Sequence, residues 1–180
     1  LKVLLFAISK DQALTLYHGF SQAGFDLDAI DIAPLAFRRA LKANLEELPE
    51  GMALFLDLGQ TSTQLIFQTV QEDVFIRNIK LNWPVSPPEI DRERHTEEII
   101  KEIDRTLDYL KTILKDVILN TIIVGGAGRD IISFEILEEK LKIPIKKGIP
   151  GMDLIMGPFP DPLYTTALGL ALGGIKVDRD

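Results

Sequence analysis

Residues 52–81 read MALFLDLGQTSTQLIFQTVQEDVFIRNIKL. They contain three short apolar runs, the first ended by Gly59 and the second by a polar turn at 71–73. The runs are residues 52–58, 63–70 and 74–81. Apolar runs of strand length that are bounded by turn residues are typical of strands joined by hairpins. The segment therefore predicts a three-stranded antiparallel meander.

Helical and strand patterns alternate after this meander. Apolar residues recur at helical spacing over 96–117, with charged residues opposite. The segments that follow are predicted as a strand at 121–124, a tight loop at 125–128, a helix at 130–141, a strand at 143–145 and a small-residue helix from 162 to about 173. The order from Met52 onward is β-β-β-α-β-α-β-α. This order predicts an α/β fold with a mixed sheet covered by helices, which resembles the ribonuclease-H-like half of an actin-type protein.

The residues before the meander form a partial β-α-β-α pattern. An apolar run at 2–8 and an alternation of apolar and polar residues at 27–32 predict strands. Ser9 and Gln12 predict a capping box for a helix that stops at Gly24. Pro34 is suited to the first turn of a second helix, which we expect to end near Leu45. Turn residues at 48–51 predict a boundary, so we divide the chain into 1–48, the last part of a first actin-like subdomain, and 52–180, a second domain.

Composition limits the function classes. Apolar residues make up 46% of the 180 residues, which is enough for a core. The net charge of −7 disfavours nucleic-acid binding, because an acidic surface repels phosphate backbones. The absence of cysteine excludes thiolate metal sites, and the only two histidines, His18 and His95, lie far apart, so we expect no metal site. We see no signal peptide and no apolar run long enough to span a membrane, and a start at Leu1 indicates a piece of a longer chain.

The turn between the first two predicted strands is the first motif whose residues suit ligand binding. It contains Asp57, Gly59, Thr61, Ser62 and Thr63. Turn amides and the three hydroxyls can donate to phosphate oxygens, while Asp57 can hold Mg²⁺ directly or through water. The alternative is a plain hairpin whose polar residues satisfy their own turn. Spacing alone leaves both interpretations open.

A glycine-rich loop between a strand and a helix is the second motif. It consists of Gly125, Gly126, Ala127, Gly128 and Arg129. Such a loop can receive an anion or let a flat ring approach the backbone. It lacks the spacing of a dinucleotide fold and the lysine of a P-loop, and the alternative is a close-packed strand–helix turn. No serine, cysteine or histidine arrangement of a nucleophilic triad is present, so we predict no catalytic residue.

Four stretches resemble the actin-like PilM family of type IV pilus assembly and the related cytoplasmic domain of the type II secretion protein GspL. They are residues 3–41, 53–67 (ALFLDLGQTSTQLIF), 121–145 and 164–174 (YTTALGLALGG). The resemblance implies that Asp57, Gly59, Thr61, Ser62 and Thr63 face phosphates and that Gly125, Gly126, Ala127 and Arg129 face adenosine. It also implies a location in the cytoplasm, peripheral to or tethered at the bacterial inner membrane. The implied partners are a secretion or pilus ATPase, or the cytoplasmic tail of an inner-membrane platform protein.

Two departures from that family bear on activity. The family's N-terminal phosphate motif is not found in these residues, and only 82–95 separates the third strand from the long helix where PilM has an extra subdomain. Both favour a non-catalytic scaffold with a vestigial nucleotide site and no required cofactor. The alternative is a nucleotide switch or actin-like ATPase that binds Mg-ATP. A fragment of a sugar or acetate kinase is less favoured, because no acidic or basic residue that would bind such a substrate is found. An open sheet edge exposes unpaired backbone groups, and formation of a homodimer is one way to cover it.

Overall fold

The computed structural model describes most of the chain in two compact units. The described residues are 5–42, 51–59, 61–69, 74–80, 89–114, 117–150 and 162–173, the side chains of 89 and 90 excepted. The units are Leu1–Ile32 and Ala33–Asp180, and each is considered by itself. The predicted boundary residues 48–50, the turn at 71–73 and the linker at 82–88 lie outside the described residues.

The first unit contains one helix, α1 (Lys10–Gln22). Its start confirms the predicted capping box: the Ser9 hydroxyl accepts the Gln12 amide at 3.2 Å, and the Gln12 side chain accepts the Ser9 amide at 3.4 Å. Its end confirms the predicted stop, because Gly24 has a φ of +80° directly after the cap residue Ala23. No residue of α1 is buried.

The two strands predicted in the first unit are wrong. Residues 5–8 and 27–32 have no regular secondary structure and are almost entirely exposed. A strand needs a neighbouring strand to accept and donate its backbone hydrogen bonds, and none is present among the described residues of this unit. The capping box, by contrast, depends only on neighbours in sequence and is present.

The second unit is built on one mixed five-stranded sheet. Its strands are β1 (Met52–Leu58), β2 (Thr63–Thr69), β3 (Val74–Ile79), β4 (Leu119–Gly125) and β5 (Ile145–Lys147). Their order across the sheet is β3-β2-β1-β4-β5. Strands β1, β2 and β3 pair antiparallel, which confirms the predicted meander, while β4 runs parallel to β1 and β5 parallel to β4. The predicted α/β fold with a mixed sheet is therefore confirmed.

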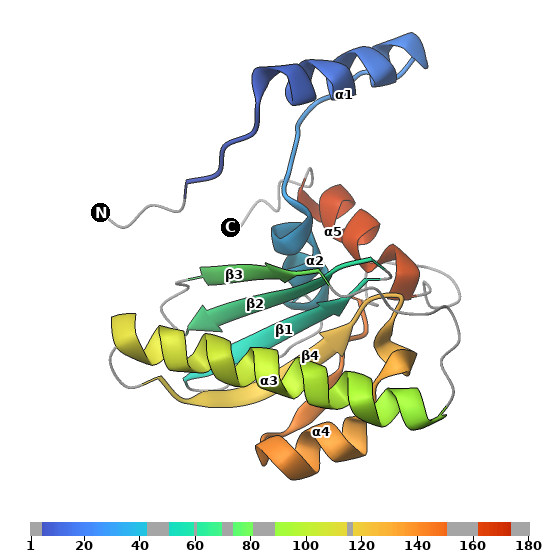
Figure 1. Cartoon of the computed structure of the whole chain (residues 1–180). Helices are drawn as coiled ribbons and strands as arrows, with labels where there is room; N and C mark the ends of the chain where they lie inside the picture. Colours follow the sequence, from blue (N-terminus) through green and yellow to red (C-terminus); the bar gives the residue numbers. More distant parts are fainter. Residues whose placement is uncertain are drawn as a thin grey trace, which may run out of the picture. The chain divides into compact units, whose positions relative to one another are not determined.

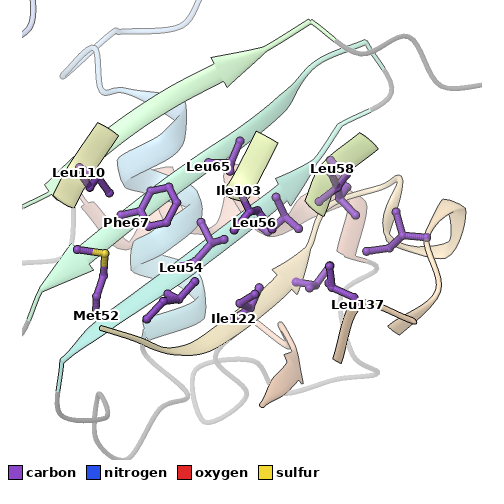
Figure 2. Close-up of a cluster of buried hydrophobic side chains, with 14 of the residues drawn as sticks. Met52, Leu54, Leu56, Leu58, Leu65, Phe67, Ile103, Leu110, Ile122 and Leu137 are labelled. Atoms are coloured by element: carbon purple, nitrogen blue, oxygen red, sulfur yellow. The ribbon is translucent and has the colours of Figure 1, made fainter. Parts of the chain in front are cut away.

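One face of the sheet, here called the α3 face, is covered by the long helix α3 (Glu89–Ile113) and by α4 (Phe134–Leu141) (Figure 1). Alternate residues of β1 and β2 point into a continuous apolar core, and Ile103 and Leu110 of α3 and Leu137 of α4 pack onto it (Figure 2). The strand residues in this core include Leu54, Leu56, Leu58, Leu65 and Phe67. Because β1 and β2 are buried on both faces, they are continuous apolar runs, which is the pattern that predicted them.

The opposite face, here called the α2 face, is covered by α2 (Ala33–Lys42) and α5 (Thr165–Gly173), the latter preceded by the short helix η2 (Pro162–Tyr164) (Figure 1). The two helices approach so closely that a Cβ at Gly169 would overlap the Ala36 carbonyl group. Arg39 also donates to the Gly169 carbonyl oxygen at 2.6 Å. The structure thus groups α2 with the sheet, whereas the division at 48–51 groups it with the N-terminal segment.

Three element bounds differ from the sequence prediction. Helix α3 begins at Glu89 rather than at Thr96. The helix predicted over 130–141 is split into the short helix η1 (Arg129–Ile131) and α4, because the Ser133 hydroxyl accepts the Ile136 amide and starts a new helix. The last strand lies at 145–147, where it pairs with β4, instead of at 143–145.

Candidate functional site

The two predicted motifs meet at one edge of the sheet. Because β1 and β4 are parallel neighbours, their carboxyl ends lie side by side, and Asp57 is in register with Gly125. The amide of Gly128 donates to the Leu58 carbonyl oxygen at 2.6 Å, which joins the loop after β4 to the end of β1. The β1–β2 turn and the glycine-rich loop therefore lie at one edge of the sheet. Below, residues 57–59, 61–63 and 125–129 are called the rim.

Glycine is required where the loop meets β1. Gly126 has a φ of +90°, and a Cβ there would overlap the Asp57 carboxylate and lie 2.7 Å from the Leu58 carbonyl oxygen. A Cβ at Gly128 would lie 2.8 Å from the same carbonyl oxygen. Real Cβ atoms do not come so close to an oxygen, so both positions exclude any side chain. The loop can therefore close on β1 only because both residues are glycine.

Several backbone amides of the rim donate within the rim itself. Gly59 donates to the Ser62 carbonyl oxygen at 3.0 Å, closing the β1–β2 turn. Ile131 donates to the Gly128 carbonyl oxygen at 3.0 Å, and Arg129 donates to that of Gly126 at 3.4 Å. A phosphate cradle needs amides that point outward to the ligand. The rim also carries three hydroxyl groups, those of exposed Thr61, half-buried Ser62 and buried Thr63.

Asp57 is the acidic group of the rim. It lies on the α2 face, two residues after Phe55 of that face's apolar cluster. Burial away from water raises the pKa of Asp57 to about 6, because a charged carboxylate is disfavoured there. No described residue forms a hydrogen bond or ion pair with it. Asp57 is therefore a buried acidic group without a partner among the described residues.

Gln64 lies directly opposite Asp57 in the β1–β2 ladder and was not predicted from the sequence as a site residue. Its side-chain oxygen Oε1 is buried and has no hydrogen-bond partner among the described residues. Opposed residues of an antiparallel pair lie on the same face, so both polar groups belong to the α2 face. The sequence did contain a signal for Gln64: counting the paired residues of the hairpin away from its turn places Gln64 opposite Asp57.

The remaining predicted residues of the loop take three different places. Gly125 is buried, and a Cβ there would lie 2.9 Å from the Phe37 ring, so its role is close packing against α2. Ala127 is exposed at the tip of the loop. The Arg129 side chain forms a 3.8 Å ion pair with Asp130 and lines a pocket with Phe134 and Lys147. The structure thus brings Asp57 close to Gly126 and joins Gly59 to Ser62, while the Arg129 side chain lies in the lining of that pocket.

Gly128 is also absent from the predicted binding residues, although it makes the bond that joins the two motifs. Within the described ranges, no group of three His, Cys, Asp or Glu side chains is placed to hold a metal ion. A search of the same residues finds no helix that is both long and apolar enough to cross a membrane.

No protein-family model matches the sequence, and no curated protein matches it. Solved structures do match the fold. The chain superposes on a protein of the PilM–PilN type IV pilus biogenesis complex with a TM-score of 0.72 at 20% identity, over 93% of this chain and 59% of that one. The ethanolamine utilization protein EutJ from Carboxydothermus hydrogenoformans matches with a TM-score of 0.53 at 18% identity, over 93% of this chain and 63% of that one.

A third match is MreB5 of Spiroplasma citri bound to ADP, with a TM-score of 0.53 at 16% identity, over 93% of this chain and 66% of that one. The chain has an actin-like fold. The actin-like resemblance inferred from the two motifs is thereby confirmed at the level of the fold. The chain spans about two thirds or less of the length of these structures, so what it does as part of a whole protein is a matter of proposal.

Proposed function

We propose that this chain is part of a PilM-like, non-catalytic scaffold subunit that binds protein partners in a type IV pilus or type II secretion platform. Two comparisons support the choice of PilM among actin-like folds. The superposition on the PilM–PilN complex has a TM-score of 0.72, against 0.53 for EutJ and for MreB5. The first segment and the closing helix at 164–174 also resemble PilM and GspL more narrowly than they resemble other actin-like proteins.

The internal use of the rim amides is the observation that carries the non-catalytic part of this proposal. Gly59, Gly128 and Arg129 all donate to carbonyl oxygens of the rim or of β1. Phosphoryl transfer depends on donors and metal ions that surround the transferred group together. The use of these three amides within the chain leaves fewer donors for a triphosphate, which favours a scaffold over an ATPase.

The class of protein partner is proposed from the structural similarity to the PilM–PilN complex. The matched structure is a complex between two pilus biogenesis proteins, PilM and PilN. For this chain we propose either a secretion or pilus ATPase, or the cytoplasmic tail of an inner-membrane platform protein. Such partners place the chain in the cytoplasm at the inner membrane. A homodimer through the free edge of β3 or β5 is a further way in which the assembly can form.

A nucleotide switch is the second candidate, and Asp57 is the observation that favours it. Its carboxylate lies at the rim and has no partner among the described residues, and Thr61 and Ser62 follow it in the β1–β2 turn. If Mg-ATP binds, Asp57 would hold the magnesium ion or its bound water, and the two hydroxyls would donate to phosphate oxygens. The bound ion would neutralise charge on the phosphates.

Calorimetric titration of the full-length protein with Mg-ATP separates the two candidates. The scaffold proposal predicts no saturable heat at micromolar nucleotide, together with retained binding to a secretion ATPase or to a platform protein's cytoplasmic tail. Micromolar binding that disappears in Asp57→Ala and persists in Asp108→Ala would overturn it. Asp108 is a suitable control because it is an exposed aspartate of α3, outside the rim.

A further inference from the structure

The two edges of the five-stranded sheet differ in length and composition. At one edge, β5 has only three residues, of which Lys146 and Lys147 are exposed, and Pro144 directly precedes it. At the other edge, β3 has six residues, and no bulge interrupts its pairing with β2 (Figure 1). Short length, lysine and proline are features by which proteins keep an edge strand from pairing with another chain. The edge at β5 is therefore guarded, whereas β3 has none of these features within its six residues.

The single charged residue of β3 does not guard its edge either. Arg77 donates to the Glu102 carboxylate at 2.6 Å and to the Thr106 hydroxyl at 2.8 Å, both on α3. Its side chain is thus held on the α3 face with its charge paired. On the same face, the ring of Phe75 lies 5.7 Å from that of Tyr109, centroid to centroid, and Tyr109 is 52% exposed. The edge at β3 therefore presents apolar surface rather than an uncompensated charge.

The hairpin register shows which backbone groups of β3 point away from the sheet. Gly59 donates to the Ser62 carbonyl oxygen, so these two residues form a hydrogen-bonded pair of the β1–β2 ladder. Hydrogen-bonded pairs alternate along an antiparallel ladder, so residues 63, 65 and 67 of β2 turn their backbone groups toward β3. Their partners in β3 are Ile79, Arg77 and Phe75. The outward N–H and C=O groups of β3 are therefore those of Val74, Ile76 and Asn78, and no strand lies beyond them in the described part of the chain.

We propose that the free edge of β3 pairs antiparallel with β3 of a second copy of this chain, with Ile76 opposite the partner's Ile76. A two-fold axis perpendicular to the sheet keeps the α3 faces of both copies on one side. It also sets Val74 opposite the partner's Asn78, so the outward backbone groups of residues 74, 76 and 78 all find partners. A register moved by one residue in each strand would set Arg77 opposite the partner's Arg77, where like charges repel.

The surface beside this edge suits a second copy. A stable interface buries roughly 800 Å² on each partner, which is more than a strand ladder alone supplies. Besides the exposed Tyr109 ring, a cavity of about 120 Å³ lined by Val74, Phe75 and Leu110 lies at the edge on the α3 face. Pairing removes part of this apolar surface from water in both copies at once. The inference narrows the homodimer of the proposed function to one edge and one register, and it does not depend on a pilus or secretion role.

Cysteine cross-linking of the full chain tests the register. The native chain has no cysteine, so an introduced one reports its contact without background. Directly opposed Cα atoms lie about 5.5 Å apart, within the range of a disulfide, so Ile76→Cys should give a disulfide-linked dimer under mild oxidation. Val74→Cys and Asn78→Cys should cross-link when mixed but not alone, because like positions lie roughly 13 Å apart. The control Lys146→Cys, at the β5 edge, should stay monomeric.

Cross-linking of Lys146→Cys with none of Ile76→Cys would place the interface at β5 and overturn the proposal. Cross-linking of Val74→Cys alone as efficiently as in the mixture would refute the register.

Sedimentation tests the dimer without cross-links. At high micromolar concentration the native chain should sediment with twice the 20.1 kDa mass of one copy. Asn78→Pro removes an outward amide and no bond to β2, so it should keep the fold and weaken the dimer about tenfold or more. The control Asn78→Ala keeps that amide and should dimerise like the native chain. A native chain of single mass, or an equally tight dimer in Asn78→Pro, would overturn the proposal, and retained binding of a platform partner would leave the scaffold proposal standing.

Discussion

The two faces of the five-stranded sheet carry different kinds of side chain. On the α3 face, β1 and β2 contribute mainly apolar residues, such as Leu56 and Phe67, and one buried hydroxyl group, that of Thr63. On the α2 face, the same strands present Asp57, Gln64 and Gln68 among their apolar residues. Gln68 is 1% exposed, and its side chain accepts a hydrogen bond from Arg38 of α2 at 3.1 Å.

This difference separates stability from the candidate site. Apolar burial stabilises the fold without imposing any chemistry, whereas a buried polar group costs free energy unless it is paired. Asp57 and Gln64 lack such partners among the described residues, and both lie on the α2 face next to the rim. We infer that the α3 face holds the sheet together, while the α2 face tolerates polar groups because they serve the rim.

The largest effect should come from the α3 face. Phe67→Ala removes a ring that is 1% exposed and lies in the centre of the apolar core (Figure 2). It should lower the free energy of unfolding by about 3–5 kcal/mol, as measured by urea denaturation. The control Ile113→Ala alters a residue of α3 that is 54% exposed and should change stability little. Similar losses in the two variants would contradict the assignment of this core.

A smaller loss should follow from Gly169→Ala on the other face. The added Cβ would overlap the Ala36 carbonyl group and force α5 away from α2. We expect a loss of about 1–3 kcal/mol, the usual range for overpacking. Gly19→Ala in α1, where nothing lies within 4 Å of the added atom, is the matched control. An unchanged melting temperature in Gly169→Ala would show that α2 does not pack on α5 as described.

Asp57 should make stability depend on pH. Its pKa is about 6 in the folded protein against an ordinary value of 3.8, so between these pH values the folded state binds more protons than the unfolded state. Stability should therefore fall as pH rises from about 4 to about 6. Asp57→Asn should remove this slope and gain about 1–2 kcal/mol at pH 7. Urea denaturation across this pH range checks both, and an unchanged slope in the variant would refute the assignment.

The smallest effect should come from the polar margin of the α3 face. Arg77 of β3 binds Glu102 at 2.6 Å and the Thr106 hydroxyl at 2.8 Å, both on α3. Because the pair is partly exposed, Arg77→Gln should cost only about 1 kcal/mol or less. The more exposed pair of Lys111 and Asp108 provides the control, since Lys111→Gln should be close to neutral. A double-mutant cycle of Arg77 with Glu102 measures the coupling, and a coupling of zero would contradict the contact.

Features that depend on neighbours in sequence were predicted well. The capping box of Ser9 and the meander follow from local patterns. Long-range packing was not predictable in the same way. The contact of Gly169 with Ala36 joins residues far apart in the chain, and the strands expected at 2–8 and 27–32 have no pairing partner among the described residues. The hydrogen bond from Gly128 to Leu58, which joins the two motifs, also depends on three-dimensional proximity, so no sequence pattern predicted it.

Hydrogen exchange at the rim tests the central claim most directly. We claim that the amides of Gly59 and Gly128 are committed to Ser62 and Leu58 within the chain. Both should exchange as slowly without nucleotide as neighbouring amides of β1, and added Mg-ATP should leave their rates unchanged. Fast exchange in the free protein, with protection only after Mg-ATP is added, would show that these amides serve a ligand and would contradict the account.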